Sequence, residues 1–264
     1  MEKIKITASI VLYNNDIRIV KDCIKSFFNT RVNVFLFLVD NSPNTRLRSL
    51  EKLNSNILYI SNPSNPGFGS SHNIAIEKIL KTESTYHLIL NPDIYYLTDV
   101  LKTLDSFMDK NQDIGHIMPK ITYPNGEYQF LCKRNPTFFD MLARGFFPKF
   151  LQKFFQKRLN KFEYKDHNYD QKIYNVPYLS GCFMFFRISI LKKVGYFDDR
   201  FFMYLEDADI TRRFLQFSKT LYYPDAQIFH HFAKFTHSSF KFKWITMKSA
   251  FTYFKKWGIL KHLI

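Results

Sequence analysis

Cysteine is scarce in this chain of 264 residues, which has only Cys23, Cys132 and Cys182. Their odd number and wide spacing fit neither a disulfide framework nor a zinc site, so we expect core thiols in a reducing compartment. A stretch of about 18 uninterrupted apolar residues, which a membrane-spanning helix needs, is also missing. The apolar run near the N-terminus is interrupted by the polar residues 14–16 before it forms a signal-peptide pattern. The sequence therefore predicts a cytoplasmic protein without a membrane span.

Acidic residues are few relative to basic ones. The chain has 38 Lys and Arg against 23 Asp and Glu, a formal net charge of +15. Such a surface attracts polyanions, and nucleic acid, anionic lipid and nucleotide phosphates all fit this charge. With 46% hydrophobic residues, the chain can bury a substantial core, as one large domain or as one domain with an appendage.

The first 120 residues alternate short β-rich runs with amphipathic helical stretches, which is typical of an α/β protein with a mostly parallel sheet. The predicted strands are Ile6–Tyr13, Val34–Asp40, Ile57–Ser61 and Tyr86–Leu90. The predicted helices between them are residues 18–28, 71–81 and 98–109.

A polar segment follows each predicted strand. These segments are Tyr13-Asn14-Asn15, Asp40-Asn41-Ser42, Asn62-Pro63-Ser64-Asn65 and Asn91-Pro92-Asp93. Turn formation alone explains any one of them. Because ligands of such sheets bind beyond the carboxyl ends of the strands, the four together predict a ligand-binding edge.

Two features of that edge suit a diphosphate. Residues 65–76 place two glycines and two serines directly before a predicted helix, an arrangement that exposes backbone N–H groups. The segment is not a P-loop, because no Gly-Lys-Ser/Thr follows, and Gly67 and Gly69 alone are a weak signal. At the end of the next strand, Asp93 offers a carboxylate for a divalent ion, which takes most of its oxygen ligands from phosphate and water.

A carboxylate cluster stands in the second half of the chain, where residues 195–213 hold five acidic side chains among aromatic and aliphatic ones. Apolar surroundings raise the cost of ionising a carboxyl group, so such a cluster tends to tune one member for proton transfer. A helix that begins near Glu206 pairs Asp209 with Arg213 and leaves Asp207 in the first turn, where the helix dipole favours an anion. Asp207 is therefore the candidate general base. The alternative is that Glu206 and Asp207 only decorate a helix N-terminus.

In this order and spacing, the motifs resemble those of family 2 glycosyltransferases, most closely bacterial rhamnosyltransferase-like members that build surface polysaccharides. The motifs are Val11-Leu-Tyr-Asn14, Val39-Asp-Asn-Ser42, Asn65 to Asn73, Asn91-Pro92-Asp93, Leu179-Ser-Gly-Cys182, and Phe197-Asp198 through Glu206-Asp-Ala-Asp209. The resemblance covers residues 4–239. It implies a GT-A fold, a nucleotide-sugar donor and inversion at the anomeric carbon by a single displacement.

The resemblance also implies roles for residues of the nucleotide-binding half. Asp40 matches the carboxylate that reads the pyrimidine ring, and Tyr13 lies beside the nucleoside. Asn65, Gly67 and Asn73 match the segment that follows along the nucleotide.

A metal site is implied at the end of the fourth strand. Asp93 matches the last carboxylate of the family's Asp-X-Asp element, while Asn91 occupies its first position, a departure that weakens the metal site. The expected ion is Mg²⁺ or Mn²⁺. His230 and His231 fall where related enzymes place a histidine that can complete the metal shell. Adjacent strand residues face opposite ways, so at most one of the two does so, and a packed or surface histidine is the alternative.

Two basic aromatic segments account for much of the positive charge. Residues 146–162 combine lysines with aromatic residues and Leu at helical spacing, and the tail, residues 240–264, repeats the pattern. Such helices can lie in the headgroup layer of an anionic membrane, or their apolar faces can pack on the catalytic domain. We expect a glycosyltransferase domain over residues 1–239, with a nucleotide-binding half (1–122) and an acceptor-side half (123–239), followed by the tail.

The predicted function is transfer of a sugar, with dTDP-rhamnose as the first choice of donor, to a hydroxyl of a lipid-linked or polysaccharide acceptor. Asp207 is the expected base, with Glu206 as the second candidate. Transfer from a UDP-hexose, a noncatalytic scaffold and nucleic-acid binding are the alternatives. Carboxylates at Asp40, Asp93 and Asp207 would repel nucleic-acid phosphates, so no nucleic-acid partner is expected. The expected location is the inner face of the cell membrane, as a peripheral protein.

Overall fold

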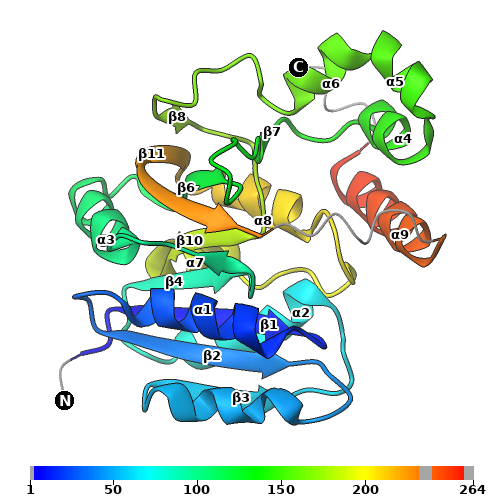
Figure 1. Cartoon of the computed structure of the whole chain (residues 1–264). Helices are drawn as coiled ribbons and strands as arrows, with labels where there is room; N and C mark the ends of the chain where they lie inside the picture. The colour runs from blue at the N-terminus through cyan, green and yellow to red at the C-terminus, as the bar shows by residue number, and fades with distance from the viewer. Residues whose placement is uncertain (1–2, 232–239, 259–264) are drawn as a thin grey trace.

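The computed structural model describes residues 3–231 and 240–258, in which helices cover both faces of a central sheet (Figure 1). The first half contains β1 (Ile6–Leu12), α1 (Ile17–Phe28), β2 (Val34–Asp40), the 3₁₀ helix η1 (Arg46–Leu53), β3 (Ile57–Ser61), α2 (Phe68–Ile79), β4 (Tyr86–Leu90), β5 (Ile94–Tyr95) and α3 (Val100–Lys110). The second half contains β6 (Ile114–Thr122), β7 (Cys132–Lys133), α4 (Phe138–Phe146), α5 (Lys149–Phe154), α6 (Gln156–Phe162), β8 (Ile173–Tyr174), β9 (Tyr178–Leu179), β10 (Phe183–Arg187), α7 (Ile188–Val194), α8 (Glu206–Phe214), β11 (Lys219–His230) and α9 (Phe240–Trp257).

The central sheet has the strand order β3-β2-β1-β4-β10-β6-β11-β5, with β8 paired to β11. The strands β1, β2, β3 and β4 run parallel, as the sequence predicts, and so do β6 and β11. Strand β10 is antiparallel to both β4 and β6, and β5 and β8 are antiparallel to β11. The four predicted strands match the observed ones to within one residue, and the predicted helix 71–81 begins earlier, at Phe68.

Apolar side chains on both faces of the sheet hold the layers together. Along β2, Leu36 and Leu38 join an apolar cluster with α1 and α3, whereas Phe37 joins a second cluster with α2, α7 and α8. Burial on both faces explains why the parallel strands read as continuous apolar runs in the sequence. The cysteines are all buried and free, as expected.

Hydrogen bonds tie together the loops that follow β1, β2 and β3. The Asn14 N–H donates to Ser42 Oγ over 2.8 Å. Asn62 Nδ2 donates to Asn41 Oδ1 over 2.7 Å, and Asn41 Nδ2 donates to Ser71 Oγ over 2.8 Å. Because these strands are parallel, their polar loops share one edge of the sheet, and this confirms the predicted grouping of the loops.

The segment 146–162 does not form the single amphipathic helix that its spacing predicts. Pro148 separates α4 from α5, because proline has no backbone N–H and its ring disfavours a continuing helix. Phe155 separates α5 from α6 with a ψ of 10°, and its ring packs on Phe139 with the centroids 4.9 Å apart. Part of the aromatic face is therefore used for internal packing, as in the alternative considered for this segment.

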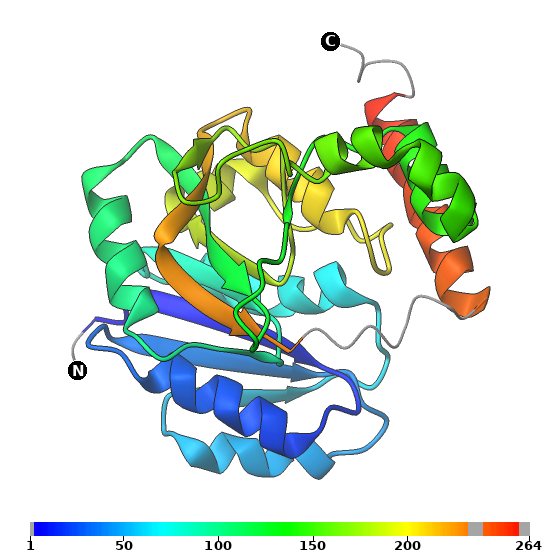
Figure 2. The ribbon, with the colours of Figure 1, turned by 45° about the horizontal axis from the view of Figure 1, so that its top comes forward.

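The tail forms α9, which lies beside α4 in Figures 1 and 2. Tyr253 and Phe254 are buried and join an apolar cluster that includes Leu205. One face of α9 therefore packs on the catalytic half, while Trp244 and Phe251 on other faces are 48% and 71% exposed. Within the described residues, no helix is long and apolar enough to span a bilayer.

Candidate active site

A pocket of about 730 Å³ opens where the second half of the sheet meets α8 and α9. The predicted site residues that line it are Asn91, Glu206, Asp207 and His230. Aromatic and basic side chains form much of the remaining wall, among them Tyr128, Phe130, Lys133, Lys165, Tyr178 and Lys243. The structure thus brings together the carboxylate cluster of α8 with the ends of β4 and β11, as the sequence predicts.

Asp207 lies in the first turn of α8, which begins at the expected residue. Its Oδ2 accepts the N–H of Gly181 and its Oδ1 accepts the N–H of Ala208, both over 2.9 Å. Gly181 lacks a side chain, and a Cβ there would lie only 3.2 Å from the Cβ of Asp207. Backbone donors and the helix N-terminus thus compensate the charge of this carboxylate. Asp209 is paired with Arg213 over 3.0 Å, which confirms the predicted ion pair.

Glu206 differs from its neighbour Asp207 in the hydrogen bonding of its carboxyl group. It is only 5% exposed, and its Oε2 has no hydrogen-bond partner among the described residues. Burial raises the pKa of the Glu206 carboxyl well above its ordinary value, and the charge of Asp207 raises it further. The buried Glu206 carboxyl therefore favours its protonated form.

Replacement of Glu206 by Gln is expected to remove a pH-dependent loss of stability. A carboxyl group whose pKa is raised in the folded state contributes fully to stability below its unfolded pKa, and this contribution is lost as the pH rises toward the folded pKa. Above the ordinary value of 4.5, wild-type stability should fall relative to Glu206→Gln by up to about 1.4 kcal/mol per pH unit. Thermal unfolding of both proteins at a series of pH values from acid to neutral measures the difference. A stability difference that stays constant with pH contradicts the shift.

Asp93 and His230 form a pair, in which His230 lines the pocket and Asp93 is not among the lining residues. The distance between Asp93 Oδ1 and His230 Nε2 is 3.3 Å. On the other side of the ring, Gln129 Nε2 donates to the His230 carbonyl oxygen and Gln129 Oε1 lies 2.9 Å from His230 Nδ1. Because Gln129 Oε1 can only accept, Nδ1 carries a proton, and Nε2 is the ring nitrogen that faces Asp93.

This arrangement fits a divalent cation that has few protein ligands. A carboxylate oxygen and an imidazole nitrogen converge, and both are suitable donors for Mn²⁺, while Mg²⁺ prefers the oxygen. Gln129 fixes the orientation of the ring, as outer partners of metal-ligating histidines commonly do. The described residues contain no group of three or more His, Cys, Asp and Glu side chains that could hold a metal ion. A cation held by Asp93 and His230 would therefore take further ligands from phosphate and water.

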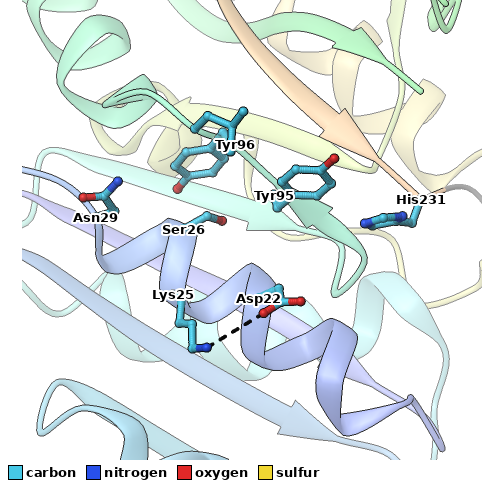
Figure 3. A pocket seen from close by; sticks show the side chains of 8 residues that line it. Asp22, Lys25, Ser26, Asn29, Tyr95, Tyr96 and His231 are labelled. Atoms are coloured by element: carbon cyan, nitrogen blue, oxygen red, sulfur yellow. Dashed lines mark ion pairs between the residues drawn. The ribbon is translucent and has the colours of Figure 1, made fainter. Parts of the chain in front are cut away.

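His231 points away from His230, as expected for adjacent residues at the end of a strand. Its ring stacks on Tyr95 with the centroids 4.9 Å apart, and its backbone N–H donates to the Asp93 carbonyl oxygen. Figure 3 shows His231 and Tyr95 beside Asp22 of α1, in a separate pocket of about 400 Å³. Of the two predicted histidines, His230 is thus the one that the structure directs toward Asp93.

The predicted nucleoside residues lie at the edge formed by β1, β2 and β3. Tyr13 is 56% exposed, directly after β1. Asp40 is buried at the end of β2, where its carboxylate accepts the Ser42 N–H over 2.9 Å and the Tyr59 O–H over 2.6 Å. Asn65 Oδ1 accepts a hydrogen bond from the loop after β2. These residues are grouped together, but they do not line the pocket that contains Asp207.

The glycine-containing segment is packed against the loop before α8. A Cβ on Gly67, whose φ is +108°, would lie 2.2 Å from the Phe202 carbonyl oxygen. The Phe68 N–H donates to that same oxygen over 2.8 Å. The Asn73 amide donates to the Phe197 carbonyl oxygen and accepts the Phe197 N–H. The sequence predicts N–H groups left open for a diphosphate, but the Phe68 N–H is already bonded to the protein. Gly67 has no Cβ, and this allows the segment to approach the Phe202 backbone closely.

Gln129 and Gly181 are site residues that the sequence alone did not single out. Gly181 lies within the Leu179-Ser-Gly-Cys182 motif, so its position was marked but its contact with Asp207 was not. Gln129 lies in the part of the chain that resembles no motif, and it touches His230 over a separation of 101 residues. No local pattern in the sequence could have indicated this contact.

Known proteins resemble this chain in sequence. The model of the family described as Glycosyl transferase family 2 matches residues 7–195. The chain is 28% identical to rhamnosyltransferase WbbL of Escherichia coli over 204 residues, which cover 74% of this chain and 73% of that protein. It is 27% identical over 150 residues to N-acetylglucosaminyl-diphospho-decaprenol L-rhamnosyltransferase of Mycobacterium tuberculosis. That match covers 56% of this chain and spans about half, 48%, of the mycobacterial protein.

Solved structures agree on the fold. TarS of S. aureus superposes with a TM-score of 0.59 at 17% identity, covering 86% of this chain and 37% of TarS. Mannosyltransferase PcManGT from Pyrobaculum calidifontis, in complex with GDP-Man and Mn²⁺, superposes with a TM-score of 0.64 at 9% identity, covering 96% of this chain and 65% of the other. The architecture is therefore the expected GT-A fold. Since the family model matches well over half of the sequence, the chain belongs to glycosyl transferase family 2 and is a glycosyltransferase.

Proposed function

We propose that this glycosyltransferase transfers rhamnose from dTDP-rhamnose, with inversion, to a hydroxyl of a lipid-linked or polysaccharide acceptor in cell-surface glycan synthesis. The observation that carries the proposal is the Asp207 carboxylate, which faces the pocket while its neighbour Glu206 favours the protonated form. The names of the E. coli and M. tuberculosis relatives support the choice of rhamnose. A UDP-hexose is the alternative donor.

Asp207 acts as the general base in this proposal. It takes the proton of the acceptor hydroxyl as the hydroxyl oxygen attacks the anomeric carbon, and the bond from that carbon to the diphosphate breaks. The nucleoside diphosphate leaves with the electron pair, and a single displacement inverts the anomeric carbon. Glu206 is the second candidate, and its raised pKa makes it an acid that already holds its proton.

Asp93 and His230 would hold Mg²⁺ or Mn²⁺ together with the donor diphosphate. When bound, the ion neutralises negative charge on the leaving diphosphate as a Lewis acid. Gln129 keeps Nε2 of His230 directed toward Asp93. Asn91, in the first position of the Asp-X-Asp element, lines the pocket that contains Asp207.

The nucleoside of the donor would lie along the edge formed by β1, β2 and β3. Tyr13 offers an exposed ring beside the base, and Asp40 offers an acceptor for the N–H of thymine or uracil. The Tyr59 hydroxyl already donates to that carboxylate, so a pyrimidine N–H competes with it for Asp40. Asn65, Gly67 and Asn73 then support the segment that borders the nucleotide.

The acceptor would enter from the side formed by residues 123–178. Tyr128, Phe130 and Tyr178 give the pocket flat apolar walls that suit the faces of sugar rings. The ammonium group of Lys133 lies 4.7 Å from the centre of the Tyr178 ring, at the same wall, and can receive an acceptor phosphate. The M. tuberculosis relative is named for a diphospho-decaprenol acceptor, which is consistent with a lipid-linked acceptor for this chain.

A panel of nucleotide sugars, followed by thermal shift and by transfer assays, tests the function. A ligand at a hundredfold its dissociation constant adds about 2.7 kcal/mol to the stability of the folded state. The largest shift is expected with dTDP-rhamnose, and a larger shift with a UDP-hexose would replace rhamnose by that sugar. Binding without transfer to any acceptor would instead favour a scaffold, and salt-sensitive binding to RNA or DNA alone would favour a nucleic-acid-binding protein.

An anionic membrane surface is the proposed partner of the exposed aromatic residues. Phe150 and Phe154 of α5 are 67% and 80% exposed, and Phe251 of α9 is 71% exposed. Both views of the ribbon place α5 and α9 on the same side of the molecule (Figures 1 and 2). Such residues, flanked by lysines, can insert into the headgroup layer.

Flotation with anionic liposomes checks the membrane proposal. The wild type is expected to float with the vesicles, and Phe150→Ser combined with Phe154→Ser to lose at least about half of the bound fraction, because the apolar insertion energy is removed. Phe217→Ser is the matched control, since Phe217 is 48% exposed on another element. Absence of wild-type association, or an equal loss with the control, removes the membrane proposal and leaves the enzyme proposal unaffected.

A further inference from the structure

The loop before α8 has a backbone conformation that needs external support. Tyr204 and Leu205 both adopt left-handed conformations, with φ values of 72° and 69°. Side chains other than glycine seldom adopt this conformation, and such residues persist only where surrounding structure holds them. Leu205 is the N-cap residue of α8, so the conformation of this loop decides where Glu206 and Asp207 begin the helix.

Helix α9 holds this loop from outside. Ser249 is 2% exposed, and its hydroxyl donates to the Met203 carbonyl oxygen over 2.7 Å. One turn further along α9, Tyr253 is fully buried in an apolar cluster with Phe201 and Leu205. The loop therefore has a polar contact and an apolar contact on the same face of α9.

The end of α9 also holds α8. Asp209, two residues after Asp207, is 0% exposed and receives donors from α9. Lys256 Nζ lies 2.8 Å from Asp209 Oδ1, and Trp257 Nε1 donates to the same oxygen over 2.8 Å. The guanidinium of Arg212 lies 4.2 Å from the centre of the Trp257 ring. A buried carboxylate must be paired. Lys256 and Trp257 of α9 therefore complete the ion cluster around Asp209 of α8, the helix that carries the proposed base.

The first turns of α9 contribute to the pocket itself, which Phe242, Lys243 and Thr246 line together with Asp207. Helix α9, like α8, lies outside residues 7–195, which match the family model.

We propose that α9 is a part of the active site, in which Ser249 and Trp257 are positioning residues that keep Asp207 against the Gly181 N–H. Thr246 and Phe242 complete the acceptor side of the pocket. The proposal depends on the proposed role of Asp207 as the base. It extends the alternative in which the apolar face of the tail packs on the catalytic domain.

Ser249→Ala and Trp257→Phe in the full chain test the proposal, because each removes one hydrogen-bond donor. Ser249→Ala scarcely changes the volume, and Trp257→Phe keeps an aromatic ring at that position. Both variants are expected to lower kcat at least about tenfold and to leave the KM for the donor within about twofold. Hydrogen exchange of residues 201–205 should become faster.

Two variants on the exposed side of α9, Lys255→Met and Met247→Ala, are the matched controls and are expected to keep kcat and KM. A kcat that falls only in proportion to the folded fraction, measured by thermal unfolding, overturns the proposal, as does wild-type turnover in both test variants. Asp207→Asn separates the proposed role of α9 from the proposed role of Asp207 as the base. If Asp207→Asn is inactive while Ser249→Ala and Trp257→Phe behave like the controls, only the role of α9 fails. If Asp207→Asn remains active, the base assignment fails.

Discussion

Asp207→Asn is expected to lower turnover by about 10²- to 10⁴-fold, the range that a positioned general base contributes. The amide cannot take the proton of the acceptor hydroxyl, yet it has nearly the same shape as the carboxylate. Donor binding should stay close to wild type, because the predicted nucleoside residues lie at the separate edge formed by β1, β2 and β3. Steady-state transfer assays with the donor found in the nucleotide-sugar panel, together with calorimetry of nucleotide binding, measure both quantities.

The neighbouring carboxyl group supplies the control for this experiment. Glu206→Gln should keep most of the turnover, because burial raises the pKa of Glu206 and favours the neutral form, which the Gln amide resembles. Gln retains a neutral amide in the same buried position. If Asp207→Asn keeps more than about a tenth of wild-type turnover, the base lies elsewhere, and loss of activity in Glu206→Gln under the same conditions would transfer the role to Glu206.

The parallel half of the fold could be predicted because its signals are local. Buried strands such as Val34–Asp40 read as continuous apolar runs, and the polar residues that end them mark the edge to which a parallel arrangement brings all of them. The beginning of α8 at Glu206 and the pair between Asp209 and Arg213 likewise follow from helical spacing.

The contacts that complete the site could not be predicted, since they join distant parts of the chain. Gln129 meets His230 over 101 residues, and Trp257 meets Asp209 over 48 residues. Periodicity also misled at residues 146–162, where the helical spacing of aromatic residues predicts one continuous helix. The observed break at Phe155 follows from the packing of its ring on Phe139, which is a tertiary contact.

Removal of the divalent cation is the second large effect that the site predicts. EDTA is expected to suppress transfer by at least about 10²-fold, and Mn²⁺ or Mg²⁺ to restore it, because the leaving diphosphate loses the charge that neutralises it. Asp93→Ala should have the same effect even with excess cation, since it removes the single carboxylate of the proposed metal site. Turnover that is unaffected by the chelator would show a metal-independent enzyme, a result that Asn91 in the first position of the element would then explain.

The two adjacent histidines allow the metal ligand to be tested without an activity assay. Titration of Mn²⁺ into the complex with a nucleoside diphosphate, followed by electron paramagnetic resonance, gives the affinity directly. His230→Ala should weaken Mn²⁺ binding at least about tenfold, and Gln129→Leu should weaken it to a smaller degree, because the leucine no longer fixes the proton on Nδ1. His231→Ala is the matched control, since that ring stacks on Tyr95 on the opposite side of β11 and should leave the affinity unchanged. Equal effects of His230→Ala and His231→Ala would contradict His230 as the metal ligand. Asp93 would then be the only protein ligand left in the proposal.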